Sequence, residues 1–104
     1  MNTAFERDRA IRAMIAGVLR AHAHRLRGYK VVLFGSRASG RARLRSDYDL
    51  GVLGAKPLPL EDFYAIEDAL EDLPTLYRID WVDLMRVSDR FRARALAQAE
   101  VLYE

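Results

Sequence analysis

The chain has 104 residues, of which 51% are hydrophobic and none is cysteine. We expect one domain over residues 1–104 with a packed core, and the missing cysteines exclude disulfides, thiolate nucleophiles and cysteine-ligated zinc. The formal net charge is only +2, so no general nucleic-acid binding is expected. The N-terminus lacks a signal-peptide core, and no apolar run approaches the roughly 20 residues of a membrane span, which predicts a cytoplasmic protein.

Residues 4–27 are predicted to form an amphipathic helix, because apolar side chains recur every three or four positions. These positions are Ile11, Ile15, Val18, Leu19, His22 and Leu26. Asn2 or Thr3 is expected to cap the helix, and Gly28 is expected to end it. His22 has no second histidine or acid at metal spacing, so it is predicted to be a packed structural residue.

A short apolar run at 29–34 predicts a buried strand. It ends in Gly35 and Ser36, and a short helix over 37–42 follows, with Ser36 as its cap and Gly40 as a turn. A strand that ends in Gly-Ser before a helix presents free N–H groups to an anion, and glycine lets a phosphate approach the backbone. Such turns are common, so this signal is weak alone.

A second strand is predicted over 49–53, and two aspartates lie at its start. Asp47 and Asp49 project from the same face of an extended chain, while the alternate positions point into the core. Those core positions are Tyr48, Leu50 and Val52. Two carboxylates so close repel each other unless a cation such as Mg²⁺ lies between them, and Gly51 is expected to leave room beside them. The alternative is a polar turn, with Asp47 capping and Asp49 solvated.

The second half of the chain predicts a helix over 60–73, a strand over 77–85 and a helix capped by Ser88 that runs to about residue 99. Residues 101–103 are either an edge strand or a docked end. The order α-β-α-β-α-β-α predicts an α/β (α+β) fold, with a small mixed sheet of three or four strands and helices mainly on one face. The other face is then available for chemistry.

Residues of the central stretch carry a family resemblance. Gly35-Ser36, Gly40 and Ser46-Asp47-Tyr48-Asp49-Leu50 match the Gly-Ser-x-x-x-Gly…Ser-Asp-x-Asp-Leu signature of the polymerase-beta-like nucleotidyltransferases. The small size resembles the minimal nucleotidyltransferase (MNT) branch, and residues 70–80 are similar to MNT proteins encoded beside a helical HEPN partner. The resemblance covers essentially the whole chain and implies the nucleotidyltransferase fold. Such pairs are described as toxin–antitoxin modules in which the MNT protein transfers AMP onto its partner.

The resemblance also implies a third carboxylate in mid-strand, for which Asp80 and Asp83 are both candidates. They have opposite parity, so only one can face the metals on a regular strand. Asp80 lies in the middle of the strand, where a bare carboxylate is costly to bury, whereas Asp83 is nearer the end and could be solvated. The resemblance selects Asp80, as the acid of the Tyr-x-Ile-Asp segment.

The mechanism that the resemblance implies is in-line attack on the α-phosphorus of ATP with release of pyrophosphate, assisted by two Mg²⁺ ions. The catalytic and metal-binding residues would be Asp47, Asp49 and Asp80, and Asp80 is also a candidate acceptor of the hydroxyl proton. The phosphates would be held by Gly35 and Ser36, assisted by Arg37. The arginines after that turn are expected to be solvated, with a partner-docking surface as the alternative. They are Arg41, Arg43 and Arg45.

The expected acceptor is a hydroxyl of a small helical HEPN-type protein encoded nearby, because no acceptor-binding domain follows the third carboxylate. The chain would then act in a homo- or hetero-oligomer as the antitoxin of the pair. One alternative is a non-catalytic or merely nucleotide-binding antitoxin that acts by binding its partner. Another is transfer to a small molecule such as an aminoglycoside, or to a nucleic-acid end.

Overall fold

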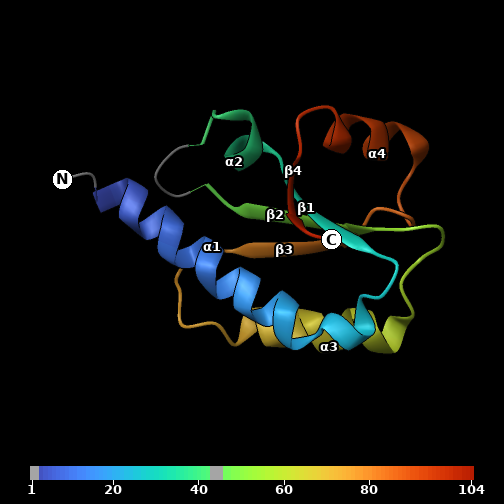
Figure 1. The fold of residues 1–104 in the computed structure, drawn as a ribbon. Coiled ribbons are helices and arrows are strands. Elements are labelled where there is room, and N and C mark those ends of the chain that lie inside the picture. The colour runs from blue at the N-terminus through green and yellow to red at the C-terminus, as the bar shows by residue number, and fades with distance from the viewer. Residues whose placement is uncertain (1–2, 43–45) are drawn as a thin grey trace.

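The computed structural model describes residues 3–42 and 46–104, in which helices and strands alternate along the chain (Figure 1). The helices are α1 (Thr3–Ala21), the 3₁₀ turn η1 (Ala23–Arg25), α2 (Ser36–Ser39), α3 (Leu60–Glu71) and α4 (Asp89–Leu96). The strands are β1 (Lys30–Phe34), β2 (Tyr48–Leu53), β3 (Ile79–Asp83) and β4 (Glu100–Tyr103). The mixed α+β fold expected from the sequence is confirmed.

The four strands form one sheet in the order β3-β2-β1-β4. Strand β1 pairs antiparallel with both β2 and β4, whereas β2 and β3 run parallel because helix α3 carries the chain back across the sheet. The alignment places Phe34 opposite Asp49, and Asp49 opposite Asp80. The C-terminal residues are therefore an edge strand, which decides between the two alternatives left open by the sequence.

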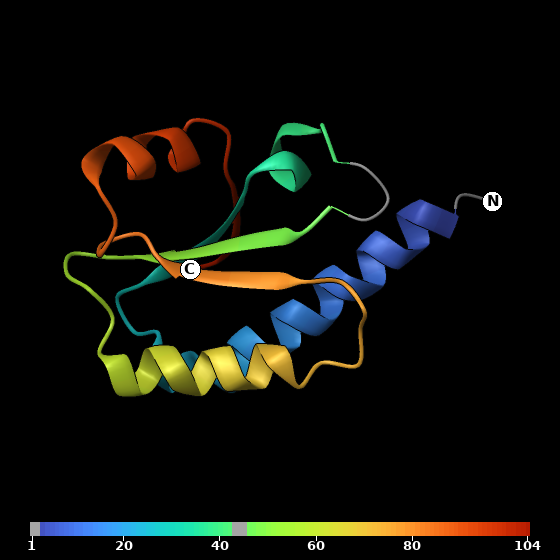
Figure 2. The same ribbon diagram turned by 180° about the vertical axis from the view of Figure 1, so that it is seen from behind.

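The main core lies between the sheet and the two longest helices, α1 and α3, which cover the same face (Figures 1 and 2). The alternation predicted for β2 is confirmed, since three of its side chains are fully buried against these helices. They are Tyr48, Leu50 and Val52. Helices α2 and α4 lie on the opposite side of the sheet, and a smaller core forms beneath α4 from Val32, Phe34, Leu84 and Ala95. Within residues 3–42 and 46–104, no helix combines the length and apolar character needed to cross a membrane.

Several element boundaries differ from the sequence prediction. Helix α1 ends at Ala21 and not at Gly28, because the chain tightens into the 3₁₀ turn before β1. The N-cap of α2 is Gly35 and not Ser36. The cap predicted for α4 is confirmed, since the Ser88 hydroxyl accepts a hydrogen bond of 3.1 Å from the backbone N–H of Phe91. The proposed cap Asn2 lies outside the described residues.

Asp83 ends β3 on the core face and is buried, with 5% of its surface exposed. Its two carboxylate oxygens accept hydrogen bonds of 2.9 Å from the backbone N–H groups of Leu58 and Met85, and Arg86 Nε lies 3.4 Å away. The expectation that this carboxylate could be solvated is therefore wrong. It stays buried because the two N–H donors and the guanidinium offset the cost of removing it from water.

We predict that Asp83→Ala lowers the free energy of unfolding by about 2–4 kcal/mol, because two backbone N–H groups lose their acceptor. Urea denaturation followed by circular dichroism measures this change. The matched control is Asp68→Ala, on the exposed side of α3, for which a change within about 0.5 kcal/mol is expected. Equal losses in both variants would contradict the structural role of Asp83.

Candidate active site

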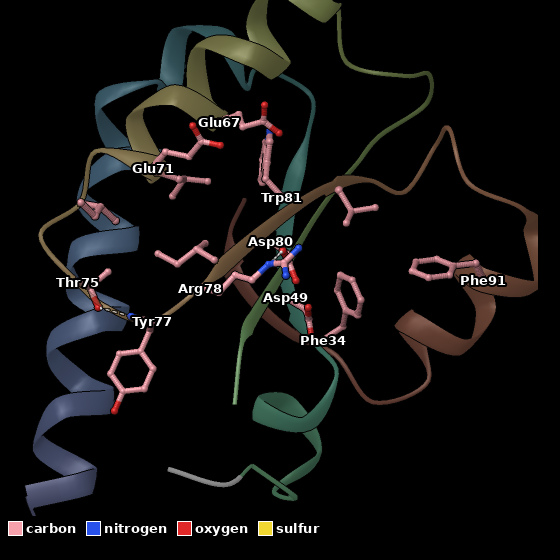
Figure 3. A pocket seen from close by; sticks show the side chains of 14 residues that line it. Phe34, Asp49, Glu67, Glu71, Thr75, Tyr77, Arg78, Asp80, Trp81 and Phe91 are labelled. Atoms are coloured by element: carbon pink, nitrogen blue, oxygen red, sulfur yellow. Dashed lines mark hydrogen bonds and ion pairs between the residues drawn. The ribbon is translucent and has the colours of Figure 1, made fainter. Parts of the chain in front are cut away.

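The candidate site lies at one end of the sheet, on the face opposite α1 and α3. Strand β1 ends at Phe34 and leads into Gly35, while the antiparallel strand β2 begins beside it and the parallel strand β3 begins beside β2. Gly35, Asp49 and Asp80 therefore come from three segments far apart in the sequence. Figure 3 shows the Asp49 and Asp80 side chains next to each other. They line a hollow of about 650 Å³, whose wall also includes Glu67 and Glu71 of α3. This size suits a small-molecule ligand.

Position 35 requires glycine because of both its backbone conformation and its neighbouring atoms. Its φ of 73° and ψ of −156° lie in a region that is open essentially only to glycine. A Cβ atom at this position would overlap Oδ2 of Asp49. The structure thus brings the predicted phosphate-binding turn into direct contact with a predicted metal-binding carboxylate, which no local sequence pattern establishes.

The electrostatics of the site are dominated by like charges. Burial raises the pKa of Asp49, and the neighbouring carboxylates of Asp80 and Asp47 raise it further, while Arg78 opposes them. Asp80 is half-buried and accepts a hydrogen bond of 2.8 Å from Nε of Arg78. The site therefore favours added positive charge.

Divalent metal chemistry fits these residues, because carboxylate oxygens are the ligands that Mg²⁺ prefers and a cation would relieve their repulsion. Asp49 and Asp80 adjoin each other, and Asp47 acts on Asp49 electrostatically. Within the described ranges, 3–42 and 46–104, no three acidic or histidine side chains already converge as a metal-binding group. Arg78 instead holds Asp80.

Gly51 does not serve the purpose expected of it. It faces the same side as Asp49, but a Cβ there would lie 2.6 Å from Leu84 Cδ1 and 3.3 Å from Phe34 Cε1. The space is filled by the small core beneath α4, and not by the candidate site. The prediction that Gly51 leaves room beside the aspartates is wrong, because strand periodicity identifies a face but not what packs on it.

The Arg37 side chain extends from α2 toward Tyr48 on the core face of β2, away from Asp49. Its guanidinium stacks 4.4 Å from the ring centroid of Tyr48 and donates a hydrogen bond of 2.9 Å from Nη2 to the backbone oxygen of Ser46. Only 10% of its side chain is exposed. This geometry makes Arg37 a residue that positions the segment entering β2, directly before Asp47. Its role as a phosphate ligand remains a prediction.

Asp8 takes part in this arrangement, although it was not predicted as a site residue. The Tyr48 hydroxyl donates a hydrogen bond of 2.7 Å to Oδ1 of Asp8 on α1. Burial and this contact with Asp8 raise the pKa of Tyr48, so the hydroxyl keeps its proton at neutral pH. Asp8 occurs among other charged residues of a helix, so no signal in the sequence distinguishes it.

The predicted arginine turn is described only in part. Arg41 is exposed, in line with the solvated turn expected there. Arg43 and Arg45 lie outside the described residues. A second hollow of about 710 Å³ lies between α1 and the segment before β3, and Asp47, Leu76 and Arg78 contribute to its wall. Arg78 lines both hollows.

Comparisons with known proteins identify the family to which this fold belongs. Residues 25–104 match the family of polymerase beta nucleotidyltransferases. The chain therefore belongs to this family.

The chain is 36% identical over 67 residues to the probable protein adenylyltransferase MntA of Haemophilus influenzae, a match covering 62% of this chain. It spans 56% of the length of that relative. It is also similar to a crystal structure of a toxin–antitoxin with AMP-PNP (26% identity, TM-score 0.60, covering 88% of this chain and 72% of that one). Its fold resembles the MNT antitoxin in complex with the tri-AMPylated HEPN toxin of Shewanella oneidensis (22% identity, TM-score 0.62, covering 91% and 71%).

The raised pKa of Asp49 predicts a pH-dependent effect of Asp49→Asn on stability in EDTA. At pH values between the pKa of Asp49 in the unfolded chain and its raised pKa in the folded protein, the folded state binds more protons than the unfolded state. The contribution of Asp49 to the free energy of unfolding therefore falls as the pH rises. Asp49→Asn removes the charge and should raise the thermal midpoint at pH 7, with a smaller gain near pH 4. Differential scanning fluorimetry at both values measures this. A midpoint lowered at pH 7 would contradict the repulsion.

A second prediction concerns the contact between Gly35 and Asp49. Gly35→Ala should weaken the binding of a fluorescent ATP analogue in Mg²⁺ by at least about tenfold, because the added methyl displaces the carboxylate. Gly40→Ala is the control, since Gly40 also has a positive φ of 78° but its Cβ would meet nothing within 4 Å. Circular dichroism shows whether both variants remain folded. Equal binding losses would contradict a specific effect of the overlap with Asp49.

Proposed function

We propose that this chain is an Mg²⁺-dependent adenylyltransferase that transfers AMP from ATP to a hydroxyl of a HEPN-type partner, and that it acts as the antitoxin of the pair. The observation that carries the proposal is the alignment of Asp49 with Asp80, in contact with the Gly35 turn, in a member of the nucleotidyltransferase family. The name of the Haemophilus influenzae relative supports the reaction. The AMP-PNP and AMPylated HEPN complexes support the nucleotide and the partner.

In this proposal the three carboxylates would hold the metal ions, and the Gly35 turn would hold the triphosphate. The metal-holding residues are Asp47, Asp49 and Asp80, and the phosphate-binding residues are Gly35 and Ser36. Bound Mg²⁺ would supply charge neutralisation of the phosphates and activation of the acceptor. Arg37 contributes indirectly, because it fixes the segment that carries Asp47 through its contact with Ser46.

The reaction forms a bond between the acceptor oxygen and the α-phosphorus and breaks the bond from the α-phosphorus to the bridging oxygen. Pyrophosphate leaves with the electron pair of that bond. The hydroxyl proton has to be taken up during attack, and Asp80 is the proposed acceptor because its carboxylate is partly exposed within the hollow. The hollow beside Asp47 offers a route by which a partner can approach.

A second candidate is an antitoxin that neutralises its partner by binding alone. The observation that favours it lies in the second hollow, between α1 and the segment before β3. Leu76 is fully exposed there, next to Pro74 and Tyr77. An exposed apolar side chain of this kind suits a protein contact whether or not AMP is transferred. Variants of the aspartates separate the two functions.

We expect Asp47→Asn to lower the transfer of label from α-³²P-ATP to a co-purified HEPN-type partner by at least about a hundredfold. EDTA should have the same effect on the unaltered protein. Asp68→Asn, an exposed change on α3, is the control and should transfer label normally. Undiminished transfer by Asp47→Asn would refute the mechanism.

The same variants test the second candidate in cells. If Asp47→Asn combined with Asp49→Asn still protects cells from the partner, binding and not transfer neutralises it. Label found on an aminoglycoside or a nucleic-acid end, with none on the HEPN protein, would change the acceptor class instead.

A further inference from the structure

Arg78 directs its side chain at the carboxylates of the candidate site. It directly precedes β3 and lies two residues before Asp80, so both side chains leave the strand on the same face. Its Nε donates the hydrogen bond of 2.8 Å to Oδ1 of Asp80, and Figure 3 shows its guanidinium beside Asp80 and Asp49. Its backbone is anchored as well, since the Arg78 oxygen accepts a hydrogen bond of 2.9 Å from the Tyr48 N–H.

The guanidinium offsets part of the repulsion within the site. Asp49 and Asp80 lie opposite each other on β2 and β3, and Nε of Arg78 lies 2.8 Å from Oδ1 of Asp80. Arg78 thus supplies charge that the carboxylates need when no metal ion is bound. It bonds to one of the oxygens that a metal ion would use.

This contact is easily broken, because 75% of the Arg78 side chain is exposed to solvent. Exposed ion pairs contribute little to stability, since water and salt screen them and the long side chain loses conformational freedom. A divalent cation brings twice the charge into the gap between Asp49 and Asp80. The flexible side chain can then move into either of the two hollows that Arg78 lines.

We propose that Arg78 is the resident counter-ion of the carboxylate site and that a divalent cation has to displace its guanidinium from Asp80 in order to bind. This inference rests on the proposed function, because it takes Asp49 and Asp80 as metal ligands. The apparent metal affinity is then lowered by the fraction of molecules in which Arg78 occupies Asp80. Arg78 sets the metal concentration that the protein needs.

The test is a titration of the purified full chain with Mn²⁺ without nucleotide, in which electron paramagnetic resonance measures the free ion. Arg78→Met should bind Mn²⁺ about threefold more tightly than the unaltered protein, because the competitor is gone. Methionine is chosen since it has no oxygen that could coordinate the ion. The control is Arg27→Met, which removes the same charge. Arg27 is exposed and precedes the start of β1, whereas the candidate site lies at the other end of that strand. This variant should bind Mn²⁺ as the unaltered protein does.

A double-mutant cycle shows whether Arg78 acts through Asp80. In an Asp80→Asn background, Arg78→Met should no longer change Mn²⁺ affinity. A threefold gain that persists in this background would overturn the proposed contact and leave only a general charge effect. Unchanged or weaker Mn²⁺ binding by Arg78→Met alone would also overturn it.

The failure of this inference can be distinguished from the failure of the proposed function. If the unaltered protein binds Mn²⁺ and Asp49→Asn abolishes binding, the metal site stands whatever Arg78→Met does. If Asp47→Asn, Asp49→Asn and Asp80→Asn all leave Mn²⁺ binding unchanged, the metal site itself is refuted, and the role of Arg78 with it.

Discussion

The candidate site depends on one constraint, which is the parallel alignment of β2 with β3. That alignment sets Asp49 beside Asp80, although like charges repel and Asp49 is partly removed from water. The repulsion is tolerated because Arg78 contacts Asp80 and because the absence of a side chain at Gly35 leaves space for the Asp49 carboxylate. The contacts of Gly35 with Asp49 and of Arg78 with Asp80 thus meet at one place because of a long-range pairing of strands.

The two faces of the sheet have different roles: one packs the main core and the other carries the carboxylates. The face covered by α1 and α3 provides the main core, and it also holds the entry to β2 through the contacts of Tyr48 with Asp8 and of Arg37 with Ser46. The opposite face carries the carboxylates. A tightly packed core behind the site keeps the carboxylates in place, because side chains in such a core have little freedom to shift.

Asp80 and Asp83 show that the position of an aspartate in the sheet determines its surroundings. Both lie on β3, three positions apart, and therefore on opposite faces. Asp83 is buried and bonded to backbone N–H groups, whereas Asp80 faces a solvent-accessible hollow and an exposed arginine. Parity alone shows that only one of them faces Asp49. The register of β3 against β2 identifies Asp80 as that residue.

The sequence by itself determined the approximate positions of the helices and strands, the cap at Ser88, and the inward and outward faces of β2. These features follow from local periodicity and short spacings, which act within a few residues. Only the tertiary structure decided that Asp49 meets Asp80, that Leu84 and Phe34 fill the space beside Gly51, and that Arg37 stacks on Tyr48. Those contacts join segments far apart in the chain, so they depend on strand order and register, which no local pattern specifies.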